Sequence, residues 1–418
     1  MQKNVGSGSL HEIQKNPEQT LINLIAMGTI SFVADTILRG ESDMGRQECI
    51  AMVLAGGKGT RLGSLTTAIP KPIVPFGGQY RLIDFTLSNC VNSGLDTVGI
   101  LTPPTPFVLP GTLPWQNGPG STYIHSLPPG SREYAGTADA VYANSPFINR
   151  YDPEHLVVLS GDHIYKMDYR DMLERHKANG AAVTIAVTAV PWPEASRFGV
   201  MTVKADGRIS EFVEKPANPR SNMVSMGVYV FNWAKLKSYL DRDHKSAASS
   251  HDFGKNIIPA MMAQNEDLYA YRFGGYWRDV GTVESLYDAH MDLLRNPPPI
   301  CLDDAVWPLY ATARKEQETT RLLADKASNS LLHSKSSIKG TIAGSVIFGQ
   351  VKIGRNANIM NSVIMPGAVI GKGARVERAL IGPGAVVRDG CLLRGGSSES
   401  SVAIVRENAI VAATVSYA

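Results

Sequence analysis

This chain of 418 residues has no large excess of charge of one sign, no paired cysteines and no long apolar run. Its 41 basic residues nearly balance its 38 acidic residues, which leaves a formal net charge of +3. Such a balance gives no electrostatic reason to expect binding to nucleic acid or to a membrane surface, although a local basic site can still hold a small anion. The four cysteines are scattered, so we expect neither a disulfide framework nor a zinc site.

No segment reaches the roughly 18 consecutive apolar residues that a membrane-spanning helix needs. The nearest candidate, residues 21–38, is interrupted by Asn23, Asp35 and other polar residues. A signal peptide is also a poor interpretation, because the first 20 residues are mixed in charge and the apolar part comes late. We therefore expect a cytoplasmic protein with no membrane partner.

Residues 1–46 stand apart, because the first pattern of a buried strand begins only at Cys49. We interpret them as an N-terminal extension outside the native domain, and we place the native start at Met44. The alternative interpretation is an amphipathic helix within residues 21–38.

Residues 47–295 alternate short apolar runs with segments of helical periodicity. Runs such as 156–159 have no polar alternation, which is typical of strands buried on both faces of a sheet. This order predicts an α/β, Rossmann-like doubly wound domain that binds its ligand near the carboxyl ends of the strands. Residues 296–335 are expected to form a linker with a helix at about 313–326.

From residue 336 to residue 418 the dominant pattern is a period of six. The apolar residues that carry it are Ile347, Ile353 and Ile359, then Ile364, Ile370 and Val376, and finally Ile381 and Val387. A triangular prism of parallel strands needs one inward apolar residue on each side, so the repeat predicts a parallel β-helix rather than a β-sandwich. Its left-handed sense is expected from the resemblance to other hexapeptide-repeat proteins.

A glycine-rich loop follows the first predicted strand. Its expected nucleotide-binding and catalytic residues are Gly56, Gly57, Lys58, Gly59, Thr60 and Arg61. Glycines let the backbone approach a triphosphate and point N–H groups at it, while the basic side chains neutralise phosphate charge. The loop is neither of the usual phosphate loops, because no Lys-Ser/Thr pair follows its last glycine and Gly-x-Gly-x-x-Gly is absent.

This loop, with Pro70-Lys71-Pro72 shortly after it, resembles the signature of the sugar-nucleotide pyrophosphorylases. Further segments match in the order of that family, at 77–85, 136–140, 160–165, 212–216, 225–229, 250–254 and 276–282. Among them, 81–85, 250–254 and 277–282 resemble the ADP-glucose branch that serves bacterial glycogen synthesis. The resemblance covers residues 47 to about 387 and implies transfer of an adenylyl group from ATP to glucose 1-phosphate.

Two aspartates are the expected metal ligands. Attack of a sugar phosphate on the α-phosphorus of a nucleotide needs no covalent enzyme intermediate, so positioning and charge stabilisation carry the catalysis. Mg²⁺ is the expected cofactor, and Asp162 and Asp279 supply the one or two carboxylates that it prefers beside phosphate oxygens. The plainer alternative is that Asp162 caps the next turn and that Asp279 pairs with Arg278.

The resemblance also assigns roles to single residues. It implies that Arg61 stabilises the transition state, that Lys71 helps to hold the phosphates, and that Asp162 belongs to the same catalytic group. Tyr134 and Gly136 are expected near the nucleotide.

The residues expected to bind glucose 1-phosphate are Lys215 at its phosphate, Glu214 and Ser225 at the sugar, and Asp252 and Phe253 in the wall of the sugar pocket. A solvated surface lysine is the plainer interpretation of Lys215. His163 follows Asp162 but has no nucleophile to activate, so we expect a structural role for it.

Residues 102–130 depart from the family pattern. Relatives usually carry a Gln-Tyr pair and a long polar loop on the nucleotide side, where this chain is rich in proline and glycine. We therefore expect weak contacts to the base. Ala68 stands where activated relatives often carry a lysine, so weak or altered activation by sugar phosphates is expected, and Arg81 either binds an anion or braces Asp84.

Three other functions remain open. A UTP- or dTTP-using glucose-1-phosphate transferase would use the same loop and aspartates. A noncatalytic regulatory subunit typically loses the loop arginine or a metal aspartate, and this chain keeps both. A β-helix acetyltransferase usually needs a histidine on the prism, and only His333 lies near it. The family suggests a homotetramer, or a hetero-oligomer with a related noncatalytic subunit.

Overall fold

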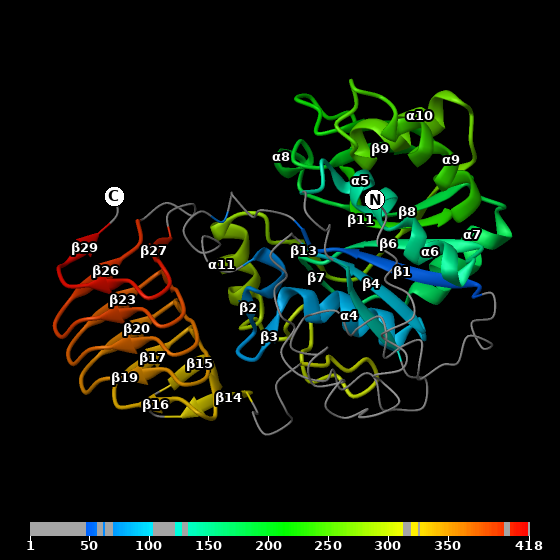
Figure 1. Ribbon diagram of the computed structural model, residues 1–418. Coiled ribbons are helices and arrows are strands. Elements are labelled where there is room, and N and C mark those ends of the chain that lie inside the picture. Colours follow the sequence, from blue (N-terminus) through cyan, green and yellow to red (C-terminus); the bar gives the residue numbers. More distant parts are fainter. Residues whose placement is uncertain are drawn as a thin grey trace, which may run out of the picture.

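The computed structural model describes residues 47–56, 62, 70–102, 122–127, 133–311, 319–324, 327–396 and 402–416. These residues form an α/β part and a β-helix that lie side by side, with helix α11 (Val283–Asp292) between them (Figure 1). The fold class expected from the sequence is therefore confirmed.

A mixed sheet is the centre of the α/β part. Within the described residues its order is β10-β9-β11-β6-β1-β4-β5, and β8 joins β11 to β12. The strands are β1 (Cys49–Leu54), β4 (Thr97–Leu101), β5 (Tyr123–Leu127), β6 (His155–Ser160), β8 (Val183–Ala189), β9 (Gly199–Val203), β10 (Ile209–Glu214), β11 (Met223–Asn232) and β12 (Leu268–Arg272). Because β1 pairs in parallel with both β4 and β6, these three strands end at one edge of the sheet.

Helices cover both faces of this sheet, because successive side chains of a strand point to opposite faces. In β1, Ile50 and Met52 pack on one side with α5 (Thr137–Ala143), α6 (Ser145–Tyr151), α9 (Trp233–His244) and α10 (Ile258–Ala263). Ala51 and Val53 pack on the other side with α4 (Leu82–Asn92) and α7 (Tyr169–Ala178). All four β1 residues are fully buried, which confirms the prediction of strands without polar alternation.

The β-helix stacks short parallel strands in three columns. One column contains β16 (Ser337–Ile338), β19 (Lys352–Ile353), β22 (Val369–Ile370), β25 (Val386–Val387) and β28 (Ile410–Val411). The second contains β17 (Thr341–Ala343), β20 (Asn358–Met360), β23 (Arg375–Glu377), β26 (Leu392–Arg394) and β29 (Val415–Ser416). The third contains β15 (Ala327–His333), β18 (Val346–Ile347), β21 (Val363–Ile364), β24 (Ala379–Ile381) and β27 (Ala403–Val405).

The period-six residues do form the inner stacks of this prism. Ile347 pairs with Ile364 and Ile364 with Ile381, while Ile359 pairs with Val376 in the next column. Each of these residues is at most 1% exposed. The inward apolar repeat read from the sequence is therefore confirmed.

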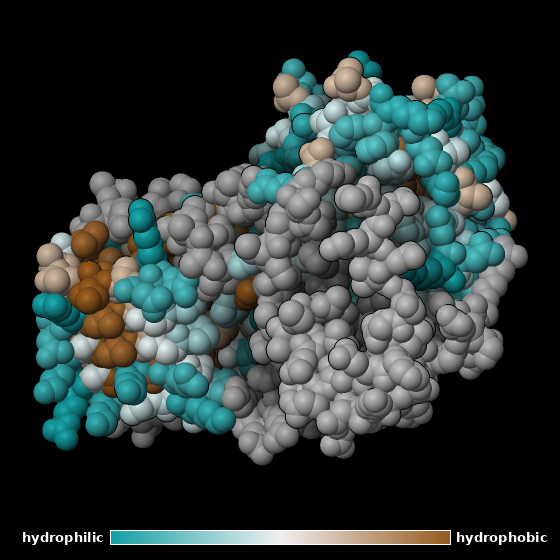
Figure 2. All heavy atoms as spheres, in the orientation of Figure 1, coloured by the Kyte–Doolittle hydropathy of each residue, from teal (hydrophilic) through white to brown (hydrophobic). Residues whose placement is uncertain are grey.

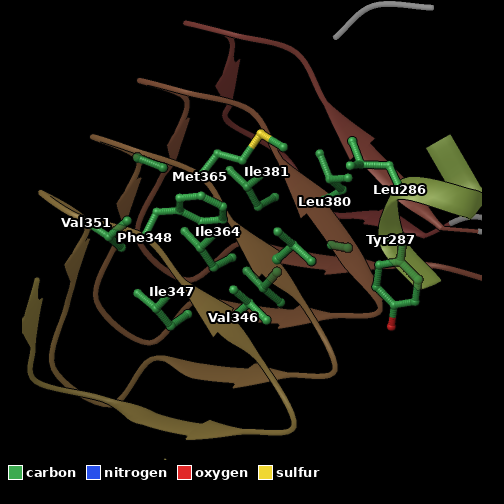
Figure 3. Packing of buried hydrophobic residues seen from close by; sticks show 14 of the residues in the cluster. Leu286, Tyr287, Val346, Ile347, Phe348, Val351, Ile364, Met365, Leu380 and Ile381 are labelled. Carbon is green, nitrogen blue, oxygen red and sulfur yellow. The ribbon is translucent and has the colours of Figure 1, made fainter. Parts of the chain in front are cut away.

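The third column is apolar on its outer side as well, and that side meets α11. Val346, Val363 and Leu380 alternate with the inward residues and belong to one buried cluster with Leu286 and Tyr287 of α11. Figure 3 shows Leu380 next to Leu286 at this junction. The Tyr287 hydroxyl donates a hydrogen bond of 2.7 Å to the carbonyl of Asn361, so the junction is apolar with a fixed polar contact.

The rest of the described surface differs between the two parts. On the face that Figure 2 shows, the described residues of the α/β part are mainly hydrophilic, whereas the β-helix carries a stripe of apolar residues. Met360 and Ile410 are among the exposed large apolar residues of the β-helix, at 38% and 60% exposure. No helix within the described residues is both long and apolar enough to cross a bilayer.

The segment expected to be a linker needs one correction. A helix was expected at about 313–326, and this is wrong for residues 319–324. They form the strand β14 (Thr319–Ala324), which pairs antiparallel with β15. A β-hairpin satisfies its backbone by extending the β-helix sheet, which a short isolated helix cannot do. β15 also lies before residue 336, although it pairs with strands of the β-helix. The boundary between linker and β-helix at residue 336 remains a prediction.

Two smaller expectations can be compared with the structure, and three others cannot. All four cysteines are free thiols. Arg81 braces Asp84, with Nη2 2.7 Å from Oδ1, and the pair caps the start of α4. The N-terminal extension, Ala68 and most of the divergent segment 102–130 lie outside the described residues.

Candidate functional site

The parallel strands β1, β4 and β6 place the expected nucleotide side at one edge of the sheet. The amide of Ala55 donates to the carbonyl of Leu101 at 3.0 Å, and the amide of Gly161 donates to the carbonyl of Leu54 at 3.0 Å. Gly56 therefore begins its loop beside the turn that carries Asp162. A Cβ on Gly56 would lie 3.9 Å from the ring of Tyr134, so Tyr134 borders the start of the loop. Gly57, Lys58, Gly59, Thr60 and Arg61 lie outside the described residues.

A small antiparallel ladder brings the two expected metal ligands together. β7 (His163–Tyr165) starts directly after Asp162, and β13 (Trp277–Asp279) ends at Asp279. His163 is the register partner of Asp279 in this ladder. The carboxylates thus meet although more than a hundred residues separate them in the chain.

Lys71 lies between these two carboxylates. It is the first residue of the short 3₁₀-helix η2 (Lys71–Ile73). Its Nζ donates to Asp162 Oδ2 at 2.6 Å and to Asp279 Oδ1 at 3.4 Å, and its side chain is 8% exposed. Burial alone would lower the pKa of Lys71, but the charges of Asp162 and Asp279 outweigh it and raise that pKa. The ammonium is therefore fully charged at neutral pH.

Asp162 is kept ionised by its surroundings. Burial alone would raise its pKa, but Lys71, His163 and a 2.8 Å hydrogen bond from Ser160 Oγ hold the pKa of Asp162 well below its usual range. A carboxylate that keeps its charge at every physiological pH is suited to binding a cation.

Two further side chains contact the carboxylate pair at longer range. His163 Nε2 lies 3.5 Å from Asp162 Oδ1 and 3.7 Å from Asp279 Oδ1, and its Nδ1 donates to the carbonyl of Met226 at 3.0 Å. Arg197 Nη2 lies 3.8 Å from Asp279 Oδ2. His163 thus contacts both carboxylates and connects them to β11, and the structural role expected for it remains a prediction.

The plainer alternative for Asp279, a pair with Arg278, is wrong. Arg278 does not pair with Asp279 but with Asp292 at the end of α11, at 2.6 Å from Nη2 to Oδ2. In an extended strand neighbouring side chains point to opposite faces, so Arg278 faces the α11 side while Asp279 faces Lys71.

The expected sugar side lies around Tyr229 of β11. Ser225 Oγ donates to the Tyr229 hydroxyl at 3.2 Å, and the ring of Phe253 stacks on the Tyr229 ring at 5.9 Å between centroids. Burial first, and then the nearby charges of Glu214 and Asp252, raise the pKa of Tyr229. Four of the five residues assigned to glucose 1-phosphate therefore surround one tyrosine that the sequence analysis left unassigned.

The Glu214 carboxylate is enclosed by two glycines. A Cβ on Gly254 would lie 2.5 Å from Glu214 Oε2, and a Cβ on Gly199 would lie 2.9 Å from the same atom. Lys215 pairs with Glu214, with Nζ 3.0 Å from Oε1, and its own backbone is left-handed with φ of +48°. The turn therefore holds the lysine, which is 54% exposed, beside the half-buried acid.

Gly136 connects the two sides of the site. It precedes α5, and the amides of Ala138 and Asp139 both donate to the carbonyl of His251. Asp252, the next residue, accepts from Thr137 Oγ1 at 3.1 Å and caps the π-helix η4 (Phe253–Ile257) through the amide of Lys255. A Cβ on Gly136 would lie 2.2 Å from the His251 carbonyl oxygen, so only glycine fits this contact.

The donor set suits one class of cation. Among the described residues there is no cluster of three or more histidine, cysteine, aspartate or glutamate side chains that could hold a metal. Mg²⁺ does not need one, because it takes one or two carboxylates and completes its shell with phosphate oxygens and water. Asp162 and Asp279 fit that requirement, whereas a structural zinc site would need more protein ligands.

The family model described as "Nucleotidyl transferase" matches residues 50–296, and the model "GlmU-like, C-terminal hexapeptide" matches residues 313–413. A glucose-1-phosphate adenylyltransferase of Desulforamulus reducens is 48% identical over 325 residues, which is 76% of this chain and 82% of the relative. One from Geobacillus stearothermophilus is 49% identical over 321 residues, covering 75% and 83%. One from Bacillus cereus is 46% identical over 373 residues, covering 87% and 99%.

Proposed function

Because the chain belongs to the glucose-1-phosphate adenylyltransferase family, we propose that it transfers the adenylyl group of ATP to α-D-glucose 1-phosphate. A phosphate oxygen of the sugar phosphate attacks the α-phosphorus of ATP, and the bond between the α- and β-phosphates breaks. The products are ADP-glucose, a glucosyl donor for glycogen, and pyrophosphate. The observation that carries the proposal is the cluster of Lys71, Asp162 and Asp279 at the strand ends, beside the sugar-side residues around Tyr229.

We assign Mg²⁺ to Asp162 and Asp279. When bound, the ion neutralises phosphate charge that develops during transfer. The chain's own residues position the reactants: Glu214 and Ser225 bind sugar hydroxyls, and Lys215 binds the phosphate of glucose 1-phosphate. Placing both substrates side by side supplies much of the rate enhancement for a reaction without a covalent intermediate. Removal of divalent cations by a chelator should abolish product formation, and added Mg²⁺ should restore it.

The proposed setting is the cytoplasm, which agrees with four free cysteine thiols. The assembly proposed from the family is a homotetramer, or a hetero-oligomer with a related noncatalytic subunit. Sedimentation of the purified chain distinguishes a tetramer from smaller forms.

The test of the function is a pyrophosphate-release assay with glucose 1-phosphate and, in turn, ATP, UTP, dTTP and GTP. We expect ATP to be used, but with poor discrimination, because segment 102–130 lacks the polar residues expected near the base. Each lost hydrogen bond to the base removes about 1 kcal/mol or more of selectivity. The measured quantity is the ratio of kcat/KM for ATP and UTP.

Each other outcome of this assay has a clear meaning. A preference for ATP above about a thousandfold, which is roughly 4 kcal/mol, shows that the base is read by residues outside segment 102–130. A preference for UTP or dTTP replaces the proposal by a related sugar nucleotidyltransferase. No turnover with any nucleotide identifies a noncatalytic subunit.

Lys215→Ala tests the sugar-phosphate assignment. Lys215 is half exposed and contacts Glu214 in the turn, so its removal should leave the fold intact. We expect the KM for glucose 1-phosphate to rise about tenfold or more, since a charge-assisted contact to phosphate is worth about 1.5–3 kcal/mol, while the KM for ATP changes little. An equal rise in both KM values contradicts the assignment. Lys235→Ala, which removes an exposed pair with Glu266, is the matched control.

A further inference from the structure

The Lys71 ammonium shares its position with the proposed metal. It contacts Asp162 Oδ2 at 2.6 Å and Asp279 Oδ1 at 3.4 Å, which are oxygens of the two carboxylates assigned to Mg²⁺. A cation held jointly by both carboxylates must lie between them, and this is where Nζ lies. Lys71 was assigned to the substrate phosphates from the sequence, so its place in the structure calls for a second role.

An ammonium and a divalent cation cannot occupy this place together. Mg²⁺ binds oxygen at about 2.0–2.1 Å, so an ion that bridges Asp162 Oδ2 and Asp279 Oδ1 would take the position between them that Nζ holds. Two cations in contact at a site with little water also repel each other strongly. We infer that Lys71 competes with the divalent cation for Asp162 and Asp279, and that the cation binds only when the ammonium moves away. The inference rests on the proposed function for its metal site.

The local structure allows the side chain to move while the backbone stays. Lys71 lies between Pro70 and Pro72, and its carbonyl accepts the amide of Val74 at 3.1 Å, so the backbone of η2 is fixed. Its four-carbon stem is flexible and its ammonium is a point charge that can change partners. His163 and Arg197 contact the carboxylates through atoms other than Nζ, at 3.5 Å to Asp162 and 3.8 Å to Asp279.

The displaced ammonium has a new partner in the nucleotide phosphates. Before substrates bind, Lys71 offsets part of the charge of the two carboxylates and reduces the repulsion between them. After the metal enters, the same charge neutralises phosphate. Metal and nucleotide then favour each other's binding, because the metal releases the lysine and the phosphates accept it. The position found in the structure and the role implied by the resemblance are two states of one residue.

The first test measures binding of Mn²⁺ alone, by the electron paramagnetic resonance signal of the free ion, without nucleotide or sugar. Lys71→Gln should bind Mn²⁺ about tenfold or more tightly than the unaltered chain, because a competing charge in direct contact with both ligands is gone. Lys71→Arg keeps the charge and should bind no more tightly than the unaltered chain. Lys166→Gln removes a half-buried lysine from its 3.2 Å pair with Asp304 and should leave Mn²⁺ binding unchanged.

The second test uses the unaltered protein and so does not depend on the folding of a variant. An amine-acetylating reagent should modify Lys71 slowly, because its side chain is 8% exposed and paired. Mn²⁺ should speed this modification severalfold, as measured by mass spectrometry of peptides, with Lys166 as the internal reference.

Equal or weaker Mn²⁺ binding by Lys71→Gln overturns the inference, as does a labelling rate of Lys71 that Mn²⁺ leaves unchanged. Neither result touches the proposed function if the unaltered chain makes ADP-glucose. Conversely, if no ADP-glucose forms but both tests give the expected results, the competition stands and the proposed function falls.

Discussion

Replacing Asp162 by asparagine is expected to lower kcat by about a hundredfold or more, because a metal site supplies several kcal/mol of charge stabilisation and each 1.4 kcal/mol is a factor of ten. Asp279→Asn should have an effect of similar size. Both changes keep the shape of the side chain and remove only its charge. The measurement is the rate of ADP-glucose formation at saturating ATP and glucose 1-phosphate.

The fold should survive either change. Lys71, Asp162 and Asp279 together carry one positive and two negative charges, so loss of one carboxylate leaves Lys71 with the other as its partner. Asp304→Asn removes a carboxylate from a different lysine pair and is the matched control, expected to keep nearly full activity. Near-normal turnover in a folded Asp162→Asn or Asp279→Asn variant would remove that residue from the metal site.

Gly136→Ala is expected to damage both substrate sides at once. The added Cβ would lie 2.2 Å from the His251 carbonyl oxygen and 2.4 Å from that of Ser250, and both are backbone atoms with little freedom to move. Relief of this clash must separate α5 from segment 250–252. The hydrogen bonds from the Ala138 amide to His251 and from Thr137 to Asp252 then break or lengthen.

We expect kcat/KM to fall about tenfold or more for both ATP and glucose 1-phosphate, and the free energy of unfolding to fall by about 1–3 kcal/mol, as for other overpacked sites. Steady-state kinetics and urea denaturation measure the two effects. Gly274→Ala is the control, because a Cβ there meets nothing within 4 Å. Wild-type kinetics in Gly136→Ala would mean that segment 250–252 does not help to shape the substrate sites.

Local patterns were sufficient to predict the fold class. Residues 156–159 lack alternation of polar and apolar side chains, and Ile347, Ile353 and Ile359 recur every six residues. Each pattern lies within a short segment, so it can be recognised without knowledge of tertiary contacts. The strand β14 was missed because its pairing with β15 is a tertiary contact, and its residues carry no clear period. Pairing across a turn can override the local preference of a short polar segment.

The candidate site could be predicted as a set of residues but not as an arrangement. Asp162 and Asp279 were named together, but the ladder of β7 and β13 that joins them is not visible in either segment. Lys71 was assigned to phosphate because its sequence context says nothing about a carboxylate partner 91 positions away. Arg197 and Gly199 were missed, since their partners Asp279 and Glu214 lie in other strands and no local motif marks them. Gly254 lies in the matching segment 250–254, but that segment does not show its contact with Glu214.

The junction of α11 with the β-helix also has a consequence for biosynthesis. The apolar face of α11 is covered by Val346, Val363 and Leu380. Leu380 is synthesised roughly 90 residues after α11, which takes several seconds at a synthesis rate of about 5–20 residues per second. During that interval Leu286 on the nascent α/β part is not yet covered by the β-helix. A messenger RNA truncated before the codon for residue 346 would therefore yield a chain in which the apolar face of α11 stays exposed. We expect such a chain to aggregate or to remain bound to chaperones.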